Sequence, residues 1–220
     1  MNIKNILKYF LRINLIIIFI FSFSYTITIS LEGDISNLKT EINNRKTVIE
    51  TKPKYEEICI SERYTTFNGN QINRTTNIKL ATDFINGTIL QPGEEFSYNT
   101  VVGKRTSSRG FKAADGFVKD LENGGYKTQK MIGGGICQVS STLHMSVKSA
   151  KLKVTERKVH GMPVSYCSRA DEATVSWGTI DFKFVNNTEN KIRIEAYIEN
   201  NTKNVPYKVV CKIWKTVEVK

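Results

Sequence analysis

One cysteine follows a run of three glycines, and its surroundings are typical of a nucleophile. The run is Gly133-Gly134-Gly135, and Cys137 comes two residues later. Glycines let the backbone turn sharply and approach a ligand closely. The apolar periodicity after the run places Cys137 in the first turn of a predicted helix, where unpaired amides and the helix dipole favour the thiolate over the thiol. The same amides are suited to binding the oxyanion of an acyl-transfer intermediate.

A histidine downstream of Cys137 is the predicted general base. The chain has two histidines, His144 and His160. His160 follows the cysteine on a predicted strand end, and an imidazole titrates in the range that proton transfer near neutral pH requires. A cysteine at a helix start with a histidine downstream is the arrangement of many cysteine acyltransferases and proteases. His144 lies about two turns further along the same helix, so we expect it to be structural.

The base needs a group that orients it, usually a carboxylate or an amide. Asp171, Glu172 and Asp181 all follow His160 on predicted strands or turns. Asp181 alternates with apolar neighbours, so we expect its side chain on the other face of the strand, in a cleft. We take Asp181 as the third catalytic residue. Asp171 and Glu172 remain alternatives, and so does a solvated carboxylate at Asp181.

Two loop arginines are predicted to bind a carboxylate of the substrate. Arginine makes paired hydrogen bonds to carboxylates, although loop arginines are also often simply solvated. The residues around the cysteine complete the expected site. The predicted substrate-binding residues are Arg105, Arg109, Gly134, Gly135, Gln138 and Ser140.

The other three cysteines, Cys59, Cys167 and Cys211, have no glycine run before them. We interpret them as core or disulfide residues. Four cysteines allow three pairings, and the sequence does not choose among them; a disulfide at Cys137 is also an alternative. Their spacing fits no zinc pattern, so we expect no metal site and no cofactor.

The elements that position these residues predict an α+β domain. Apolar periodicity predicts helices over residues 73–86 and 137–150. Alternation predicts strands, which are a short strand from Thr88 and strands over residues 96–102, 154–160, 162–167, 174–185, 192–198 and 207–214. Residues 103–135 hold eight glycines and are predicted to be loop-rich. We expect one domain whose largely antiparallel sheet packs on the helix that starts at Cys137.

The N-terminal segment predicts export. Residues 13–31 carry no charged side chain, and nineteen residues at about 1.5 Å each nearly cross a hydrocarbon core of about 30 Å. Lys4, Lys8 and Arg12 precede this segment, so the positive-inside rule leaves the N-terminus in the cytoplasm. We predict a transmembrane signal anchor in the cell membrane, with the C-terminal domain on the wall side. A cleaved signal peptide is the alternative.

These observations divide the chain into an anchor (1–32), a helical stalk or linker (33–57) and a domain (58–220). The formal net charge is +11, which attracts polyanions. Export excludes nucleic acid as a partner, so we expect anionic wall polymers or the membrane surface.

Colinear motifs over about residues 64–200 resemble those of the VanW family. They are Asn73-Arg74, Asn77-Ile78, Pro92-Gly93-Glu94 with Phe96-Ser97-Tyr98-Asn99, residues 133–142, Glu156-Arg157 with His160, Ala173-Thr174-Val175, and Asp181-Phe182-Lys183-Phe184 with Asn186-Asn187. Two positions depart from the family pattern. The family commonly has an aromatic residue at position 144, and it has aspartate where this chain has Glu172.

The resemblance implies a peptidoglycan L,D-transpeptidase whose nucleophile is Cys137. The thiolate would attack the third residue, diaminopimelate, of a tetrapeptide stem and expel D-alanine. An amine of a neighbouring stem would then resolve the thioester into a 3-3 cross-link, and water would make the enzyme a carboxypeptidase. The alternative is a non-catalytic wall-binding or sensing module linked to glycopeptide resistance. The partner in either case would be a peptidoglycan stem peptide.

Overall fold

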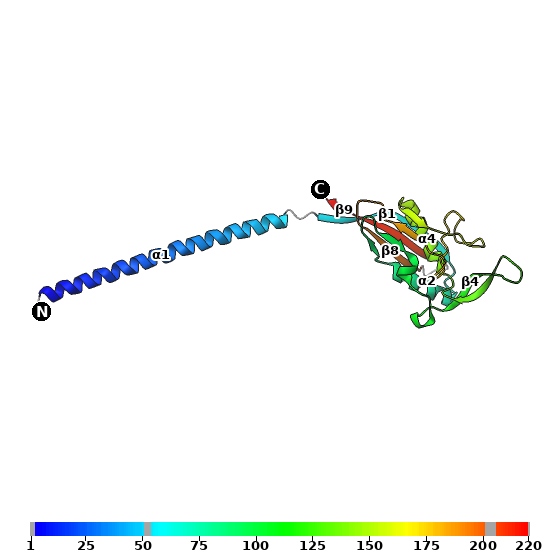
Figure 1. Ribbon diagram of the computed structural model, residues 1–220, viewed down its shortest axis with the longest axis horizontal. Coiled ribbons are helices and arrows are strands. Elements are labelled where there is room, and N and C mark those ends of the chain that lie inside the picture. Colours follow the sequence, from blue (N-terminus) through cyan, green and yellow to red (C-terminus); the bar gives the residue numbers. More distant parts are fainter. Residues whose placement is uncertain (1–2, 51–53, 201–205, 220) are drawn as a thin grey trace. The chain divides into compact units, whose positions relative to one another are not determined.

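The computed structural model describes residues 3–50, 54–200 and 206–219. The chain divides into two units, Met1–Lys54 and Tyr55–Lys220. The first unit is a single helix, α1 (Ile3–Glu50), and the second holds the sheets and the remaining helices (Figure 1). The predicted stalk, residues 33–57, is therefore helical as far as Glu50. Its last four residues, 54–57, belong to a strand.

The described side chains of α1 are all exposed. Hydroxyls interrupt its apolar positions and bond back to the helix, as Ser22 does to the carbonyl of Phe19 (3.0 Å) and Thr28 to that of Ser24 (2.9 Å). No helix in the described part of the chain has an apolar stretch long enough to cross a membrane. The predicted transmembrane helix is therefore not supported. Positions 16, 17, 25, 26, 29 and 30 of the predicted span lie outside the residues whose side chains are described.

A four-stranded sheet forms one layer of the second unit. Its order is β1 (Lys54–Phe67), β9 (Tyr207–Val219), β8 (Ile192–Glu199) and β2 (Ile89–Leu90). Strands β8 and β9 are antiparallel and place the buried Ile194 opposite Ile213. Helix α2 (Ile72–Ile85) packs against β8, and helix α4 (Cys137–Ser149) packs against β9. The α+β class with antiparallel sheets is confirmed.

Helix α4 is the centre of the core. Its apolar residues Val139, Leu143 and Val147 are fully buried because they recur at helical spacing on one face. The Ser146 hydroxyl donates to the carbonyl of Cys211 in β9 at 2.7 Å. This packing fixes the start of α4 against the sheet, and the predicted helix is confirmed.

A three-stranded sheet supports the other side of α4. Its order is β3 (Glu95–Ser97), β7 (Lys183–Val185) and β6 (Lys153–Glu156). A short helix, α3 (Tyr98–Val102), follows β3 directly because the Ser97 hydroxyl caps it by accepting from the Thr100 amide at 3.1 Å. The predicted strand over 96–102 is thus wrong after Ser97.

A hairpin forms most of the region that was predicted to be loop-rich. After the 3₁₀ turn η1 (Ser107–Arg109), strands β4 (Ala113–Lys119) and β5 (Tyr126–Ile132) pair along their whole length. The hairpin extends from the body of the second unit (Figure 1). Side chains of β5 are exposed throughout, so its sequence lacks the apolar alternation that marks a half-buried strand.

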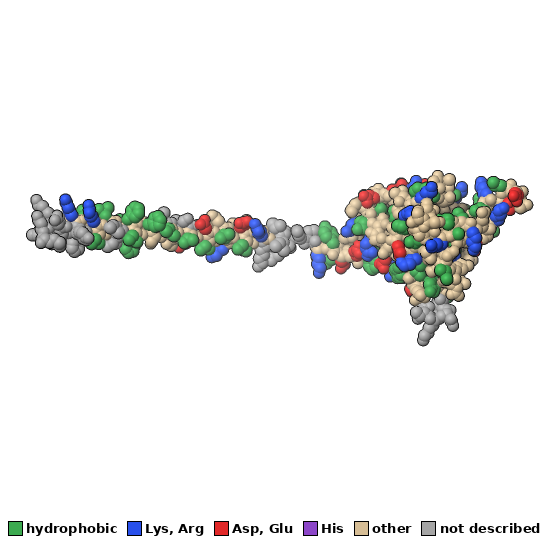
Figure 2. Space-filling view, turned by 90° about the horizontal axis from the view of Figure 1, so that it is seen from below, with side chains coloured by type: hydrophobic (Ala, Val, Ile, Leu, Met, Phe, Trp, Pro, Cys, Tyr) green, Lys and Arg blue, Asp and Glu red, His purple; other side chains and the backbone are tan. Residues whose placement is uncertain are grey.

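Residues 157–182 connect β6 to β7 with little regular structure, apart from a single bridge between Ser176 and Ile180. The strands predicted over 154–160, 162–167 and 174–185 are therefore wrong for residues 157–160, 162–167 and 174–182, because amides of this segment bond to side chains of its surroundings. Basic side chains are spread over the visible face of the folded unit and are mixed with acidic ones (Figure 2).

Candidate active site at the start of α4

The glycine turn before α4 is pinned to the hairpin. Gly133 and Gly135 have φ angles of 84° and 99°, a conformation that favours glycine. Gly134 lies against the backbone carbonyl of Ala114 in β4, so closely that a side chain would not fit. The buried Asn77 amide donates to the carbonyls of Gly134 and Lys112, both at 2.9 Å. The turn therefore leads into α4 along a fixed path.

Cys137 is the first residue of α4 and is partly exposed. Its sulfur accepts from the backbone amide of Val175 at 3.5 Å and lies 3.6 Å from the Thr174 hydroxyl. Both contacts come from the segment between β6 and β7. The amide and the hydroxyl favour a thiolate, whereas the carbonyl oxygen of Val175, to which the sulfur can donate at 3.5 Å, favours the thiol.

The amides of the first helical turn are occupied. Gln138 N donates to the carbonyl of Gly135 (3.1 Å), and Val139 N donates to that of Ile136 (2.9 Å). The oxyanion role expected of these two amides is therefore not available in this conformation.

The carboxylate of Glu172 contacts two nitrogens of His160. Glu172 Oε2 accepts from the His160 backbone amide at 2.8 Å and lies 2.9 Å from its Nδ1. His160 also lies close enough to Cys137 for each group to shift the pKa of the other. Because Nδ1 faces Glu172, Nε2 is the nitrogen that serves the cysteine. Cysteine, histidine and glutamate thus form one chain of contacts.

The two titrating partners favour the ion pair. Burial acts to raise the pKa of the Cys137 thiol, but the hydrogen bond and charge of His160, with the contacts from Val175 and Thr174, outweigh it and lower that pKa. Burial acts to lower the pKa of His160, yet the hydrogen bonds and charges of Cys137 and Glu172 raise it. Thiolate and imidazolium stabilise each other.

Hydrogen bonds fix the segment that carries Glu172. Ser140 Oγ donates to the carbonyl of Ala173 at 2.6 Å, and Ser141 Oγ accepts from the Ala173 amide at 2.9 Å. On the other side, Arg169 donates to the carbonyl of His160 at 2.7 Å. Helix α4 therefore positions both the sulfur and the strip of chain that carries its partners.

Aromatic rings enclose the imidazole. Phe117 of β4 and Tyr166 stand edge-on to His160, with ring centroids 6.1 and 6.4 Å from it. The Tyr126 ring, at the start of β5, lies directly on Gly161. The hairpin thus covers one side of the histidine and limits the access of water to it.

Residues 73–208 match the sequence family described as "VanW like protein". The chain belongs to the VanW family. Among curated relatives, it is 41% identical over 138 residues to the uncharacterized protein YoaR of Bacillus subtilis, an overlap of 62% of this chain and 43% of the relative. It is 34% identical over 124 residues to the vancomycin B-type resistance protein VanW of Enterococcus faecalis, covering 54% and 43%. The chain therefore spans less than half the length of these relatives. No solved structure matches it.

The carboxylate beside the histidine occupies the position where the VanW family has aspartate. That residue is Glu172, not Asp181. Asp181 accepts from the Asn99 amide at 2.9 Å and from the Ser97 hydroxyl at 2.6 Å, so it caps α3. The oxygens of Asp181 are therefore used away from His160, and the structure does not bring this predicted catalytic residue to the imidazole. Asp171 pairs with Lys148 at 2.8 Å and is also not the orienting group.

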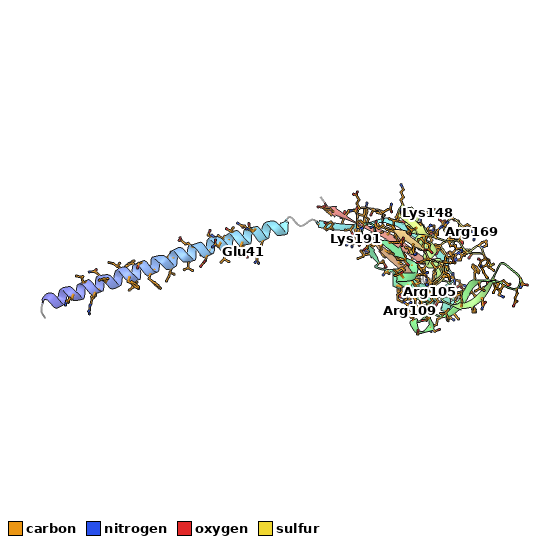
Figure 3. The ribbon with its side chains drawn as sticks, viewed as in Figure 1. Glu41, Arg105, Arg109, Lys148, Arg169 and Lys191 are labelled. Carbon is orange, nitrogen blue, oxygen red and sulfur yellow. The ribbon has the colours of Figure 1, made fainter. Side chains whose placement is uncertain are left out.

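Neither predicted arginine lines an open site. Arg109 donates to the carbonyls of Val102 and Lys104, both at 2.7 Å, and lies over the Phe84 ring. Arg105, from the same loop (Figure 3), donates to Asn99 at 2.6 Å. Its Nε and Nη2 are buried without a partner among the described residues. Arg109 is thus paired with backbone carbonyls, whereas Arg105 lies against Gly133 and its charge interacts with Cys137.

The residues that flank Cys137 act indirectly. Gln138 is buried; its Nε2 donates to Thr65 (2.9 Å) and its Oε1 accepts from Arg74 (2.8 Å). Ser140 is buried and bonded to Ala173, as described above. The space beside Gly134 is filled by the backbone of Ala114, and the space beside Gly135 by the side chain of Arg74. The polar atoms of Gln138 and Ser140 are thus paired within the chain, and their substrate-binding roles stay predictions.

Sequence reasoning missed Arg74. It lies in the first turn of α2, against Gly135 and Gln138, and its charge acts on Cys137. The one available signal was the Asn73-Arg74 pair among the motifs shared with the VanW family.

The remaining histidine and cysteines have other environments. His144 is buried, bonds the carbonyl of Asp171 at 2.8 Å and stands edge-on to Phe182, as expected for a structural residue. The four cysteines, all within the described residues, are free. The predicted disulfide alternatives are therefore not found; Cys211 is a core residue, while Cys59 is exposed.

Proposed function

We propose that this domain is a cysteine acyltransferase of the L,D-transpeptidase type that acts on peptidoglycan stem peptides. Cys137 is the nucleophile, His160 the proton carrier and Glu172 the group that orients the histidine. The observation that carries the proposal is the position of His160, which is bonded to the buried Glu172 and lies close enough to Cys137 for the two to shift each other's pKa. Such a chain of contacts is the shared geometry of Cys-His and Ser-His hydrolases and transferases.

The first step forms a thioester. The Cys137 thiolate attacks the carbonyl carbon of the third stem residue, and a carbon–sulfur bond forms. As the tetrahedral intermediate collapses, the imidazolium of His160 gives its Nε2 proton to the leaving nitrogen, the carbon–nitrogen bond breaks, and D-alanine departs.

The second step transfers the acyl group. An amine of a second stem attacks the thioester carbon and passes a proton to neutral His160. The carbon–sulfur bond then breaks, which restores the thiolate and the imidazolium. Glu172 stabilises the imidazolium in both resting and product states. If water replaced the amine, the same steps would be a carboxypeptidase reaction.

The proposed site of action is the outer face of the cell membrane. Lys4, Lys8 and Arg12 before an uncharged segment support export, and the net charge of +11 suits an anionic wall. The printed name of the Enterococcus faecalis relative, a vancomycin resistance protein, supports a role at the wall.

Intact-mass spectrometry of the full chain with purified tetrapeptide muropeptides tests the proposal. We expect a covalent adduct on the parent protein, cross-linked dimers in solution, and neither product from Cys137→Ala. Cross-links formed at the parent rate by Cys137→Ala would reject the enzyme. Muropeptide binding without any adduct or turnover would instead support a wall-binding or sensing module.

A further inference from the structure

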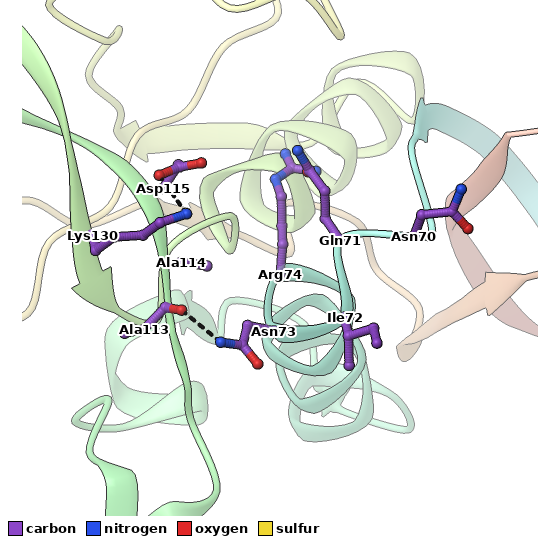
Figure 4. Close-up of a pocket in the computed structure, with 9 residues that line it drawn as sticks. All are labelled: Asn70, Gln71, Ile72, Asn73, Arg74, Ala113, Ala114, Asp115 and Lys130. Carbon is purple, nitrogen blue, oxygen red and sulfur yellow. Dashed lines mark hydrogen bonds and ion pairs between the residues drawn. The ribbon is translucent and has the colours of Figure 1, made fainter.

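A pocket of about 330 Å³ opens between helix α2 and the β4–β5 hairpin (Figure 4). Asn73 and Arg74 of α2 line one side, and Ala114 and Asp115 of β4 with Lys130 of β5 line the other. The Asn73 amide donates to the carbonyl of Ala113 at 3.0 Å and closes the floor between helix and hairpin. The volume of the pocket lies in the range of about 300–1,000 Å³ that is typical of ligand pockets.

The pocket lies next to the glycine turn that precedes Cys137. A side chain added at Gly135 would meet the Arg74 side chain at 2.7 Å, and Gly135 lies two residues before Cys137. Gly134 lies against Ala114, which also lines the pocket. Arg74 is near enough to Cys137 for the two charges to interact.

Arg74 is held in place with donors to spare. Its Nη2 donates to Gln138 Oε1 at 2.8 Å, its one hydrogen bond within the described chain. Gln138 is itself fixed by Thr65 and by the carbonyl of Thr66, both at 2.9 Å. A guanidinium has five N–H donors, so a fork remains for a planar anion, and little side-chain freedom is lost when it binds.

The charges of the pocket leave Arg74 available. Asp115, a carboxylate whose charge acts on Arg74, is paired with Lys130 at 2.8 Å. Arg74 is partly buried, and burial is the main influence that lowers its pKa, whereas the acidic groups around it, Cys137 and Asp115 among them, raise it. A partly desolvated cation of this kind gains more from an anion than a solvated one does.

We propose that this pocket binds a carboxylate of the donor stem peptide and that Arg74 is the residue that binds it. The inference rests on the proposed function, since it names the part of the substrate that directs the scissile carbonyl to Cys137. The donor has two such groups: the C-terminal carboxylate and the free side-chain carboxylate of its third residue.

Equilibrium binding to the full-length Cys137→Ser protein tests this without turnover. Three tetrapeptides serve as probes: the free acid, its C-terminal amide, and a form amidated on the third side chain. We expect one of the two amidated peptides to bind about tenfold or more weakly than the free acid, which identifies the carboxylate. Equal affinity for all three would overturn the proposal, and this comparison needs no change in the pocket.

Arg74→Gln in the Cys137→Ser background should remove the preference for the free acid. Lys79→Gln is the matched control, because it deletes one positive charge from α2 at an exposed position paired only with Asp83 in the described chain. An unchanged preference in Arg74→Gln would also overturn the proposal. If the parent protein formed no thioester but still preferred the free acid, the proposed acyltransferase activity would be rejected. The proposed carboxylate-binding role of the pocket would still hold.

Discussion

A single oxygen of Glu172 accepts from both the backbone amide and the ring nitrogen of His160, at 2.8 and 2.9 Å. Two bonds to one atom fix the ring plane and its tautomer together. Glu172 is fully buried, so its charge is weakly screened where it faces the imidazole. The contact with Glu172 favours the protonated form of His160, which is the form that can pair with a thiolate.

The pH profile of thiol alkylation should report this pairing. Thiolate is the reactive form, and the lowered pKa of Cys137 keeps it populated at a lower pH than an ordinary thiol. In a Cys59→Ser background, iodoacetamide labelling of Cys137 should fall off at lower pH than in the same protein with His160→Ala. Rates measured by mass spectrometry over a pH series provide the comparison, and superimposable profiles would contradict the ion pair.

Glu172→Gln should preserve the shape of the site and remove its charge. We expect acyl transfer to fall by about 10²–10⁴-fold, as for an orienting carboxylate replaced by its amide. The alkylation profile should also shift to higher pH, because the raised pKa of His160 depends in part on Glu172. Asp181→Asn is the control: it should cost about 1–3 kcal/mol of stability and leave the profile in place. A shift in the control would return Asp181 to the catalytic set.

His144→Phe should leave acyl transfer unchanged, because the ring packs on Phe182 and does not contact Cys137. Burial lowers the pKa of His144, so the unfolded chain takes up a proton there before the folded one does as pH falls. His144 therefore lowers the free energy of unfolding as the pH falls through the range in which an ordinary histidine titrates. Urea titrations at pH 7 and pH 5 should show a smaller loss of stability in the variant than in the parent; an equal loss would refute this.

Gly134→Ala should damage both stability and activity. Its new methyl would meet the backbone of Ala114 and Asp115, which cannot rotate away, and overpacking of this kind costs about 1–3 kcal/mol. Gly124→Ala is the comparison. Gly124 lies in open space at the hairpin tip with a φ of 76°, so an alanine there meets no neighbour and costs only backbone strain. Thermal unfolding and acyl transfer measured on both proteins separate the effects. Full activity in Gly134→Ala would show that the hairpin can shift without disturbing the thiol.

Local sequence patterns predicted the position of Cys137 at a helix start, whereas its contacts depend on residues far away in the sequence. The glycine run and the apolar repeat of α4 are short-range signals, so the helix start at Cys137 was predictable. Glu172 was not separable from Asp181, because residues 157–182 have no regular period and alternation around Asp181 imitated a strand. Arg74 lies far upstream of Cys137 in the sequence, and only folding brings it beside Gly135.

The four residues from Glu172 to Val175 link the two halves of the chemistry. Glu172 contacts the imidazole, and the amide of Val175 donates a hydrogen bond to the sulfur. Between them, two serines of α4 form hydrogen bonds with the backbone of Ala173. The length of this strip sets the distance between His160 and the sulfur of Cys137. An insertion or deletion of one residue there would move the imidazole away from the sulfur, and it would also cost stability because Ala173 and Val175 belong to the core.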